Sequence, residues 1–294
     1  MSLLEEVRSS CAEIASRARR VRIDLEAASA VTPSSPPGLD PERHYLEGPP
    51  EDVADYLLAL DSINFGSGWF PSLRKRLSEG RPLSGYFTVS WALADHVRAN
   101  GPPTASWLRG VSTGEISAIL GQSPDHELMS LYAQSLRSLG GLLGGRRALE
   151  LVHESAGSAE RLAGTLAGGM AMFDDRGFYK RAQILPGDLS LAGVAEFEDL
   201  DRLTIFADNL LPHVLRHDGV LVYEEALSAW IDSGRPLPMG EAEREIRACA
   251  VHACELISKR TGVPPRELDA WLWSRGQAPE YKALPRHRCR TVFY

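Results

Sequence analysis

An acidic residue, Asp208, lies in an apolar stretch four positions before Pro212. A proline lacks an N–H and clashes with the carbonyl four residues earlier, so a helix over residues 202–217 would be kinked at Asp208. A carboxylate in apolar surroundings is costly unless it has a partner, and a kink with a buried acid often marks a functional site. The alternative is that Asp208 caps a helix that begins there, with Pro212 tolerated near its start.

A lysine at position 180 is the second candidate for chemistry. It lies in the stretch DDRGFYKRAQI, where Tyr179, Lys180 and Arg181 are consecutive. On a helix these three side chains point in different directions, so one can face inward while Arg181 stays in water. A lysine in an apolar setting can hold a phosphate or assist a leaving group. The alternative is an ordinary surface lysine.

Two further segments carry groups that suit recognition of a planar ring. The stretch DSINFGSGWFP places Phe65 among glycines, which favours stacking on a ligand, or else a turn whose aromatic residues pack into the core. A cluster of acids that includes Asp199 and Asp201 lies just before residue 202, and its carboxylates could accept hydrogen bonds from N–H donors of a ligand. Its alternative is a solvated loop at a helix N-terminus.

The C-terminal stretch LPRHRCRTVFY concentrates basic residues before an apolar end. Such a run could close over an anion, or it could be a docked tail. The basic positions are Arg286, His287, Arg288 and Arg290.

Composition narrows the function classes. The chain has 294 residues, 39 Asp and Glu against 32 Lys and Arg, and a formal net charge of −7, which disfavours coating of duplex nucleic acid or an anionic membrane. Four unpatterned cysteines fit buried apolar positions in a reducing compartment. We find no signal peptide, no apolar run of about 20 residues and none of the familiar nucleotide, hydrolase or metal motifs. We therefore expect a cytoplasmic protein without a metal or organic cofactor.

Helical periodicity dominates the chain and strand-like alternation is rare. We expect one all-α domain over residues 1–294, in which residues 1–50 form a long amphipathic helix and a Pro-rich loop that packs on the rest. The capping sequence STGE predicts a helix start near Ser112. Further helices are expected near 52–60, 125–139, 145–156, 158–170, 177–185, 188–195, 202–217, 221–232, 239–259 and 265–274.

Several of these segments, in fixed order from about residue 50 to the end, resemble the queuosine salvage proteins, which are queuosine 5′-phosphate N-glycosylase/hydrolases. The resemblance implies an all-α fold related to helix-hairpin-helix DNA glycosylases and hydrolysis of the N-glycosidic bond to release queuine. The matching stretches are DSINFGSGWF, GYFTVSWALADHV, FYKRAQI, FEDLDRLTIFADNLLPHVL, GVLVY, EREIRACAVHACELI, LDAWLW and PRHRCRTVFY.

The resemblance implies that Lys180 and Asp208 carry the catalysis. The chain reads FADNLLPH where relatives have FADYR followed by Pro-Gln, which puts side contacts in doubt but neither the aspartate nor the proline. A carboxylate suits an oxocarbenium-like sugar, and a cation suits the 5′-phosphate. The expected substrate contacts are His44, Phe65, Tyr179, Asp199, Asp201, Asn209 and Arg288.

Two other functions stay open at this point. A glycosylase acting on a base in DNA or RNA would need a basic stripe and salt-sensitive binding. A non-catalytic helical interaction protein would use the N-terminal helix as a partner surface. The expected partner is a small nucleotide rather than duplex nucleic acid or a membrane.

Overall fold

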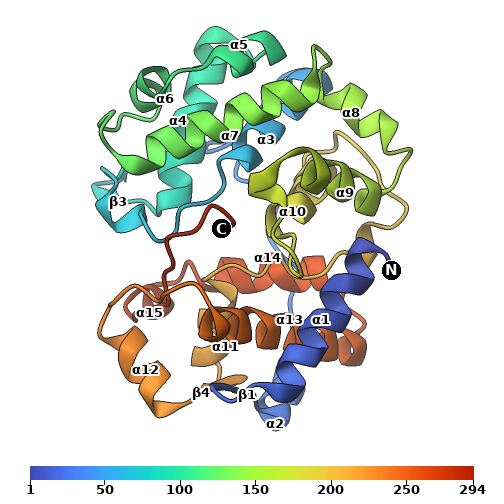
Figure 1. Cartoon of the computed structure of the whole chain (residues 1–294), viewed down its shortest axis with the longest axis vertical. Helices are drawn as coiled ribbons and strands as arrows, with labels where there is room; N and C mark the ends of the chain where they lie inside the picture. Colours follow the sequence, from blue (N-terminus) through green and yellow to red (C-terminus); the bar gives the residue numbers. More distant parts are fainter. The chain divides into compact units, whose positions relative to one another are not determined.

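A computed structural model describes all residues, 1–294, and shows an all-α protein with fifteen α-helices and two small two-stranded sheets (Figure 1). The chain divides into two compact units. Unit 1 comprises residues 1–37, 175–183 and 201–291, and unit 2 comprises residues 38–174, 184–200 and 292–294. The expectations of one domain over 1–294 and of a helix-hairpin-helix relationship stay predictions.

Unit 1 is organised around its longest helix, α13 (Glu241–Thr261). Helix α1 (Leu3–Arg17) packs along α13, as Figure 1 shows, and buries Leu4, Val7 and Cys11. The remaining elements of this unit are β1 (Val21–Ile23), α2 (Leu25–Ala30), α11 (Leu211–His217), β4 (Leu221–Tyr223), α12 (Glu225–Asp232), α14 (Pro265–Arg275) and α15 (Pro279–Lys282).

The prediction of one long N-terminal helix is wrong beyond Arg17. The carboxylate of Glu245 accepts the backbone N–H groups of Arg19 and Arg20 at 3.1 and 2.7 Å, which draws the chain out of the helix. Residues 21–23 then pair with β4 as antiparallel strands, with Arg22 opposite Val222. These partners lie about 200 residues or more away along the chain, so no local pattern could predict them.

Unit 2 contains the helices of the middle of the chain. Helix α3 (Pro50–Ser62) is buried from Val53 to Ser62, and α7 (Glu127–Leu143) packs against it. The other elements are η1 (Phe70–Ser72), β2 (Leu77–Ser78), β3 (Arg81–Pro82), α4 (Gly85–Asn100), α5 (Ala105–Gly110), α6 (Thr113–Ile119), α8 (Ala148–Glu154), α9 (Ala159–Gly169) and η2 (Ala171–Phe173).

The expected capping sequence is confirmed at the start of α6. The hydroxyl of Ser112 accepts the N–H of Glu115 at 3.1 Å, and the Glu115 carboxylate accepts the N–H of Ser112 at 2.8 Å. Both bonds satisfy N–H groups that a helix start would leave without a partner.

Two expectations in the second half of the chain need correction. The helices expected at 177–185 and 188–195 are one helix, α10 (Lys180–Leu191), which begins in unit 1, continues in unit 2 and tolerates Pro186 inside it. The kinked helix expected over 202–217 does not exist. Instead η3 (Leu200–Arg202) is followed by residues 203–210 without regular structure, and then by α11.

Candidate functional site

The segment that carries Asp208 ends at the start of α11. Oδ1 of Asp208 accepts the backbone N–H groups of Leu210 and Leu211 at 2.6 and 3.1 Å. Pro212 lies in the first turn of α11, where a backbone N–H would have no partner within the helix, so a proline is tolerated there. Asp208 is not the N-cap of α11, because that position is Leu210 and it has no side-chain cap. The Asp208 carboxylate instead holds the turn just before the helix, and the expected kink is absent. Oδ2 of the half-buried side chain accepts no hydrogen bond from the protein, so this oxygen is open to a ligand.

Three side chains hold the backbone immediately before Asp208. Gln183 accepts the N–H of Thr204 at 2.9 Å, and Asp269 accepts the N–H of Phe206 at 2.6 Å. The Arg247 guanidinium donates to the carbonyl of Ala207 at 2.9 Å. The segment has no helix or strand to fix it, so these bonds position the carboxylate that follows. All three of these side chains are buried.

Arg247 is in turn held by two buried acids. Its guanidinium donates to Asp175 through two nitrogens and to Glu243 at 3.3 Å, and it lies over the ring of Phe178 at 3.9 Å. Removal of one member of such a buried ionic group leaves an uncompensated charge, which typically costs about 3–5 kcal/mol. The Asp208 segment is thus attached to a rigid part of unit 1.

Lys180 is the first residue of α10 and is 4% exposed, so the surface-lysine interpretation is wrong. Arg181, expected in water, is only 1% exposed. Tyr179 precedes them in the left-handed region, with φ of 49°. Its N–H donates to the carbonyl of Asp175 at 2.7 Å, and its hydroxyl donates to the Glu6 carboxylate at 3.1 Å. Tyr179 therefore anchors the start of α10.

The basic C-terminal run, residues 286–290, belongs to the same unit as Asp208. The Asn209 side chain donates to the carbonyl of His287 at 3.0 Å, so Asn209 ties this run to the Asp208 segment. Burial lowers the pKa of His287 to about 3, with nearby arginine charges adding to the effect, so its imidazole is neutral. Burial also lowers the pKa of Arg286, while the Asp208 carboxylate opposes that shift. Asp208 and Arg286 are therefore within electrostatic reach of each other.

Buried His44 and half-buried Tyr86 form a pair in unit 2. Nδ1 of His44 lies 2.8 Å from the carbonyl of Asp40, and Nε2 lies 2.9 Å from the hydroxyl of Tyr86. If Nδ1 carries the proton, the Tyr86 hydroxyl donates to Nε2. Burial lowers the pKa of His44 and raises that of Tyr86, and the Asp188 carboxylate raises the latter further. Both groups are held neutral, and the hydrogen bond between them joins the loop before α3 to the start of α4.

The other expected contacts have partners within the protein. The Phe65 ring is 1% exposed and lies edge-on to Tyr132, with centroids 5.0 Å apart, as expected for an aromatic residue in a core. Asp199 accepts the N–H of Ala159 at 2.6 Å and the hydroxyl of Ser158 at 2.7 Å at the start of α9. Burial raises the pKa of Asp199, but these hydrogen bonds outweigh it and the net shift is downward.

Asp201 belongs to unit 1, whereas Asp199 belongs to unit 2. The side chain of Asp201 is 67% exposed and forms an ion pair with Arg266 at 2.8 Å. The solvated interpretation of the acidic cluster therefore describes Asp201 well.

Sequence reasoning missed four residues of this arrangement: Gln183, Tyr86, Arg247 and Asp269. Gln183 and Asp269 lie inside the quoted stretches FYKRAQI and LDAWLW, and Arg247 lies inside EREIRACAVHACELI. A polar residue within an otherwise apolar helical stretch was the available signal, because a buried polar group needs a partner.

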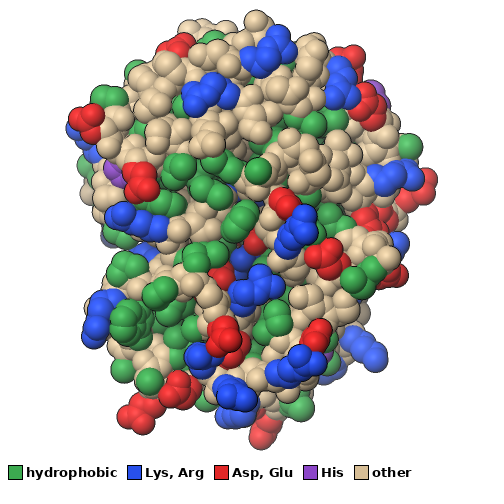
Figure 2. All heavy atoms as spheres, in the orientation of Figure 1, with side chains coloured by type: hydrophobic (Ala, Val, Ile, Leu, Met, Phe, Trp, Pro, Cys, Tyr) green, Lys and Arg blue, Asp and Glu red, His purple; other side chains and the backbone are tan.

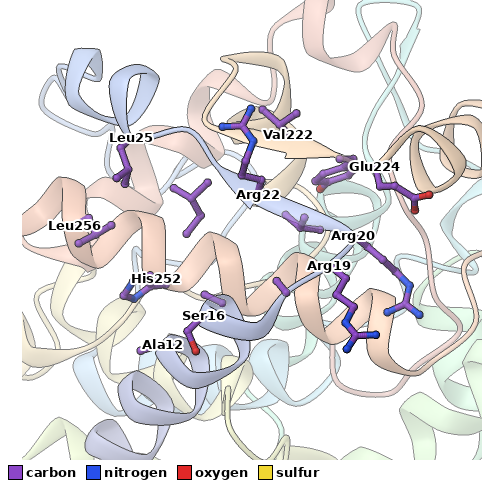
Figure 3. Close-up of a pocket in the computed structure, with 15 residues that line it drawn as sticks. Ala12, Ser16, Arg19, Arg20, Arg22, Leu25, Val222, Glu224, His252 and Leu256 are labelled. Atoms are coloured by element: carbon purple, nitrogen blue, oxygen red, sulfur yellow. The ribbon is translucent and has the colours of Figure 1, made fainter.

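A cavity of about 600 Å³ opens elsewhere in unit 1, among α1, β1, β4 and α13 (Figure 3). Figure 3 shows Ala12 and Ser16 on α1, with His252 and Leu256 on α13. The cavity includes no residue expected to do chemistry. Arg20 is paired with Glu241 and Glu245, and Arg22 with Asp24, so these two charges are compensated within the protein.

The structure contains no group of three or more His, Cys, Asp or Glu side chains suited to a metal ion. All four cysteines are free and buried. None of the helices has the length and apolar character needed to cross a bilayer.

Comparison with known proteins identifies the family to which this chain is similar. Residues 43–294 match the family described as queuosine salvage protein. A queuosine 5′-phosphate N-glycosylase/hydrolase of Sphaerobacter thermophilus is 31% identical over 309 aligned residues, covering 96% of this chain and 95% of the relative. Proteins of the same name match from Dictyostelium discoideum, 39% identical over 40% of each chain, and from Mus musculus, 28% identical over 84% of this chain and 83% of the relative.

Proposed function

This chain belongs to the queuosine salvage protein family, and we propose that it hydrolyses the N-glycosidic bond of queuosine 5′-phosphate and releases queuine. The observation that carries the proposal is the carboxylate of Asp208. One of its oxygens is fixed by two backbone N–H groups, the other is open, and the segment before it is held by three buried side chains. The names of the relatives supply the substrate.

In the proposed reaction the bond between the ribose anomeric carbon and the base nitrogen breaks, and its electron pair leaves with the base. The sugar develops positive charge, which the Asp208 carboxylate stabilises. Water then adds to the anomeric carbon and gives up one proton, for which Asp208 is the candidate acceptor. The base takes up a proton, so the products are queuine and ribose 5-phosphate.

Lys180 is the second proposed catalytic residue. Its position at the start of α10 is set by Tyr179 and by the hydrogen bonds of Gln183, one of which also holds the Asp208 segment. An ammonium group at that point would assist the departing base or meet the substrate's phosphate. Tyr179 and Asn209 are proposed to contribute through the positions they give to their neighbours.

The base contacts stay proposals from the sequence. For His44 the pair with Tyr86 is neutral, but both ring nitrogens already lie within hydrogen-bond distance of the Asp40 carbonyl and the Tyr86 hydroxyl, so a base would have to replace one of these partners. Phe65 as a stacking ring, and Asp199 or Asp201 as acceptors, would require those side chains to leave their present partners.

We also propose that the substrate is a free mononucleotide and that the reaction is cytoplasmic. The net charge of −7 disfavours duplex nucleic acid, and four free cysteines fit a reducing compartment. On the face drawn in Figure 2, Lys and Arg side chains alternate with Asp and Glu side chains. No cofactor enters the proposed reaction.

The test is release of queuine, followed by mass spectrometry, from queuosine 5′-phosphate, with guanosine 5′-phosphate and a queuosine-containing transfer RNA in parallel. Release from the mononucleotide alone, unchanged by a chelator, is expected. Release only from the transfer RNA would favour a polynucleotide glycosylase. No release from any of them by folded protein would favour an interaction protein.

A further inference from the structure

A cavity of about 510 Å³ opens in unit 2 between α4, α6 and the chain that precedes β2. Cavities of this size hold small organic molecules. The lining includes none of the residues expected to act on queuosine 5′-phosphate, and three of its side chains are consecutive cations: Arg74, Lys75 and Arg76. Asp95 is the one acid in the lining, and it is shared between Arg76 at 2.6 Å and Arg98 at 3.3 Å. The cavity therefore carries an excess of positive charge.

Arg76 is fixed in this lining by three contacts. Its backbone N–H donates to the hydroxyl of Thr88 at 3.3 Å, and its guanidinium lies over the ring of Trp91 at 3.9 Å. Within the guanidinium only Nη1 has a partner, Asp95, so the donors on Nε and Nη2 are not used within the protein. A guanidinium that is already held in one orientation loses little conformational entropy when it binds a ligand.

The backbone of Arg74 is fixed as well. The side-chain amide of Gln122 accepts the N–H of Arg74 at 2.9 Å and donates to the carbonyl of Arg74 at 2.9 Å. Gln122 follows the end of α6, so these two hydrogen bonds join two walls of the cavity. The Arg74 side chain is exposed and has no partner within the protein, which leaves its charge available to a ligand.

Helix α4 adds an uncharged donor to the lining. Burial lowers the pKa of His96, so its imidazole is neutral at pH 7. The Asn100 amide donates to Nδ1 of His96 at 3.2 Å, which places the ring proton on Nε2, and this N–H has no partner within the protein. Apolar side chains complete the lining, namely Ala92, Ala118, Ile119 and Leu120. The cavity thus combines cations, one neutral donor and an apolar wall.

We propose that this cavity of unit 2 is a second binding site, which takes a small organic phosphate other than the substrate of the proposed reaction. The three lining cations less the one acid leave two positive charges, which a phosphate monoester dianion would balance. Its three terminal oxygens can accept charge-assisted hydrogen bonds from Arg74, Lys75 and Arg76, while its organic part lies against the apolar wall. A carboxylate has two oxygens and one charge, so it matches these donors less well.

Binding to the full chain is measured by titration calorimetry at constant ionic strength, with phenyl phosphate, inorganic phosphate and phenol as probes. Phenyl phosphate should bind, inorganic phosphate should bind about threefold to tenfold more weakly because it lacks apolar surface, and phenol should not bind. Arg74→Gln and Arg76→Gln should each weaken phenyl phosphate binding about tenfold to a hundredfold. Arg109→Gln is the control and should change nothing, because this exposed arginine of the same unit lies outside the lining.

A matched pair of variants separates the charge of the lining from its shape. Ala118 is exposed on α6, so substitutions there should not disturb the fold. Ala118→Glu places a carboxylate in the lining and should weaken phenyl phosphate binding at least about tenfold. Ala118→Gln has the same size without the charge and should weaken binding less than about threefold.

Queuine release separates this cavity from the substrate site. All of these variants should release queuine from queuosine 5′-phosphate at nearly the original rate. Loss of release together with loss of phenyl phosphate binding would overturn the proposal, because the cavity would then be part of the substrate site. Phenyl phosphate binding that is equal in the original protein, Arg74→Gln and Ala118→Glu would overturn it as well, as would no binding at all. If even the original protein releases no queuine, the proposed function fails, and the calorimetric comparison still decides the cavity.

Discussion

Asp208 has a structural role and a proposed chemical role, and two substitutions separate them. In Asp208→Asn the remaining carbonyl oxygen can still accept the N–H groups of Leu210 and Leu211. Asn and Asp side chains both accept backbone N–H groups in turns of this kind, so the free energy of unfolding should change little. The negative charge is lost, and loss of one stabilising group of this kind typically lowers kcat by about 10²–10³.

In Asp208→Ala both roles are lost. The two N–H groups lose their acceptor, so the free energy of unfolding should fall by about 1 kcal/mol as well, within a range of about 0.5–1.5. Queuine release measures the first role, and urea unfolding measures the second. Asp232→Asn is the matched control, because this surface acid pairs only with Arg216 and should leave turnover unchanged.

The outcome for the Asn variant decides between the two roles. If Asp208→Asn turns over at nearly the original rate while Asp208→Ala is unstable, the side chain only stabilises the turn before α11. Loss of turnover in both, with stability lost only in the Ala variant, is the expected result.

Three further predictions follow from buried groups. Asp269→Ala removes the acceptor of the Phe206 N–H, so the free energy of unfolding measured in urea should fall by about 1–3 kcal/mol. Asp269→Asn keeps an oxygen that can accept this N–H, so most of the stability should be retained. Burial lowers the pKa of His213 to about 4 and that of His287 to about 3, against about 6.5 in an unfolded chain, so both imidazoles take up protons on unfolding. The free energy of unfolding should therefore fall as the pH drops from about 7 towards 4, by up to about 1.4 kcal/mol per pH unit for each histidine, and His213→Asn should flatten the profile; a flat profile in the original protein would contradict this. The four buried cysteines should not react with a thiol reagent in the native protein at pH 8, and all four should react in guanidinium, since burial raises the pKa of Cys11 and Cys249 to about 12.

The features that the sequence predicted well are those that depend on neighbours along the chain. The capping box at Ser112 and Glu115 and the helix expected near 125–139 follow from residues within one or two turns. The break after Arg17 does not, because it depends on Glu245 and on pairing with β4. Periodicity continued through residues 18–25 and gave no sign of the competing partner.

The candidate site follows the same division. Local pattern made Asp208 and Lys180 candidates, as an acid in an apolar stretch four residues before a proline and as a lysine that could face inward, and the family resemblance then selected them for catalysis. The residues that hold them were missed, since Gln183 and Asp269 look like ordinary polar positions until their bonds to Thr204 and Phe206 are seen. Arg181 was expected in water because consecutive residues of a helix point in different directions and only one of the three was expected to face inward, yet its side chain is buried.

The placement of the carboxylate has a physical cost that argues for its use. A helix or strand fixes its own backbone through hydrogen bonds along or between segments, but residues 203–210 have neither. The protein instead draws on buried polar side chains from α10, α13 and α14, each of which must be desolvated to reach this segment. An ordinary connection would leave these carbonyl and N–H groups in water at no such cost. Three separate helices each use a buried polar side chain to hold the backbone just before Asp208. A need to place the Asp208 carboxylate precisely explains this arrangement better than stability alone.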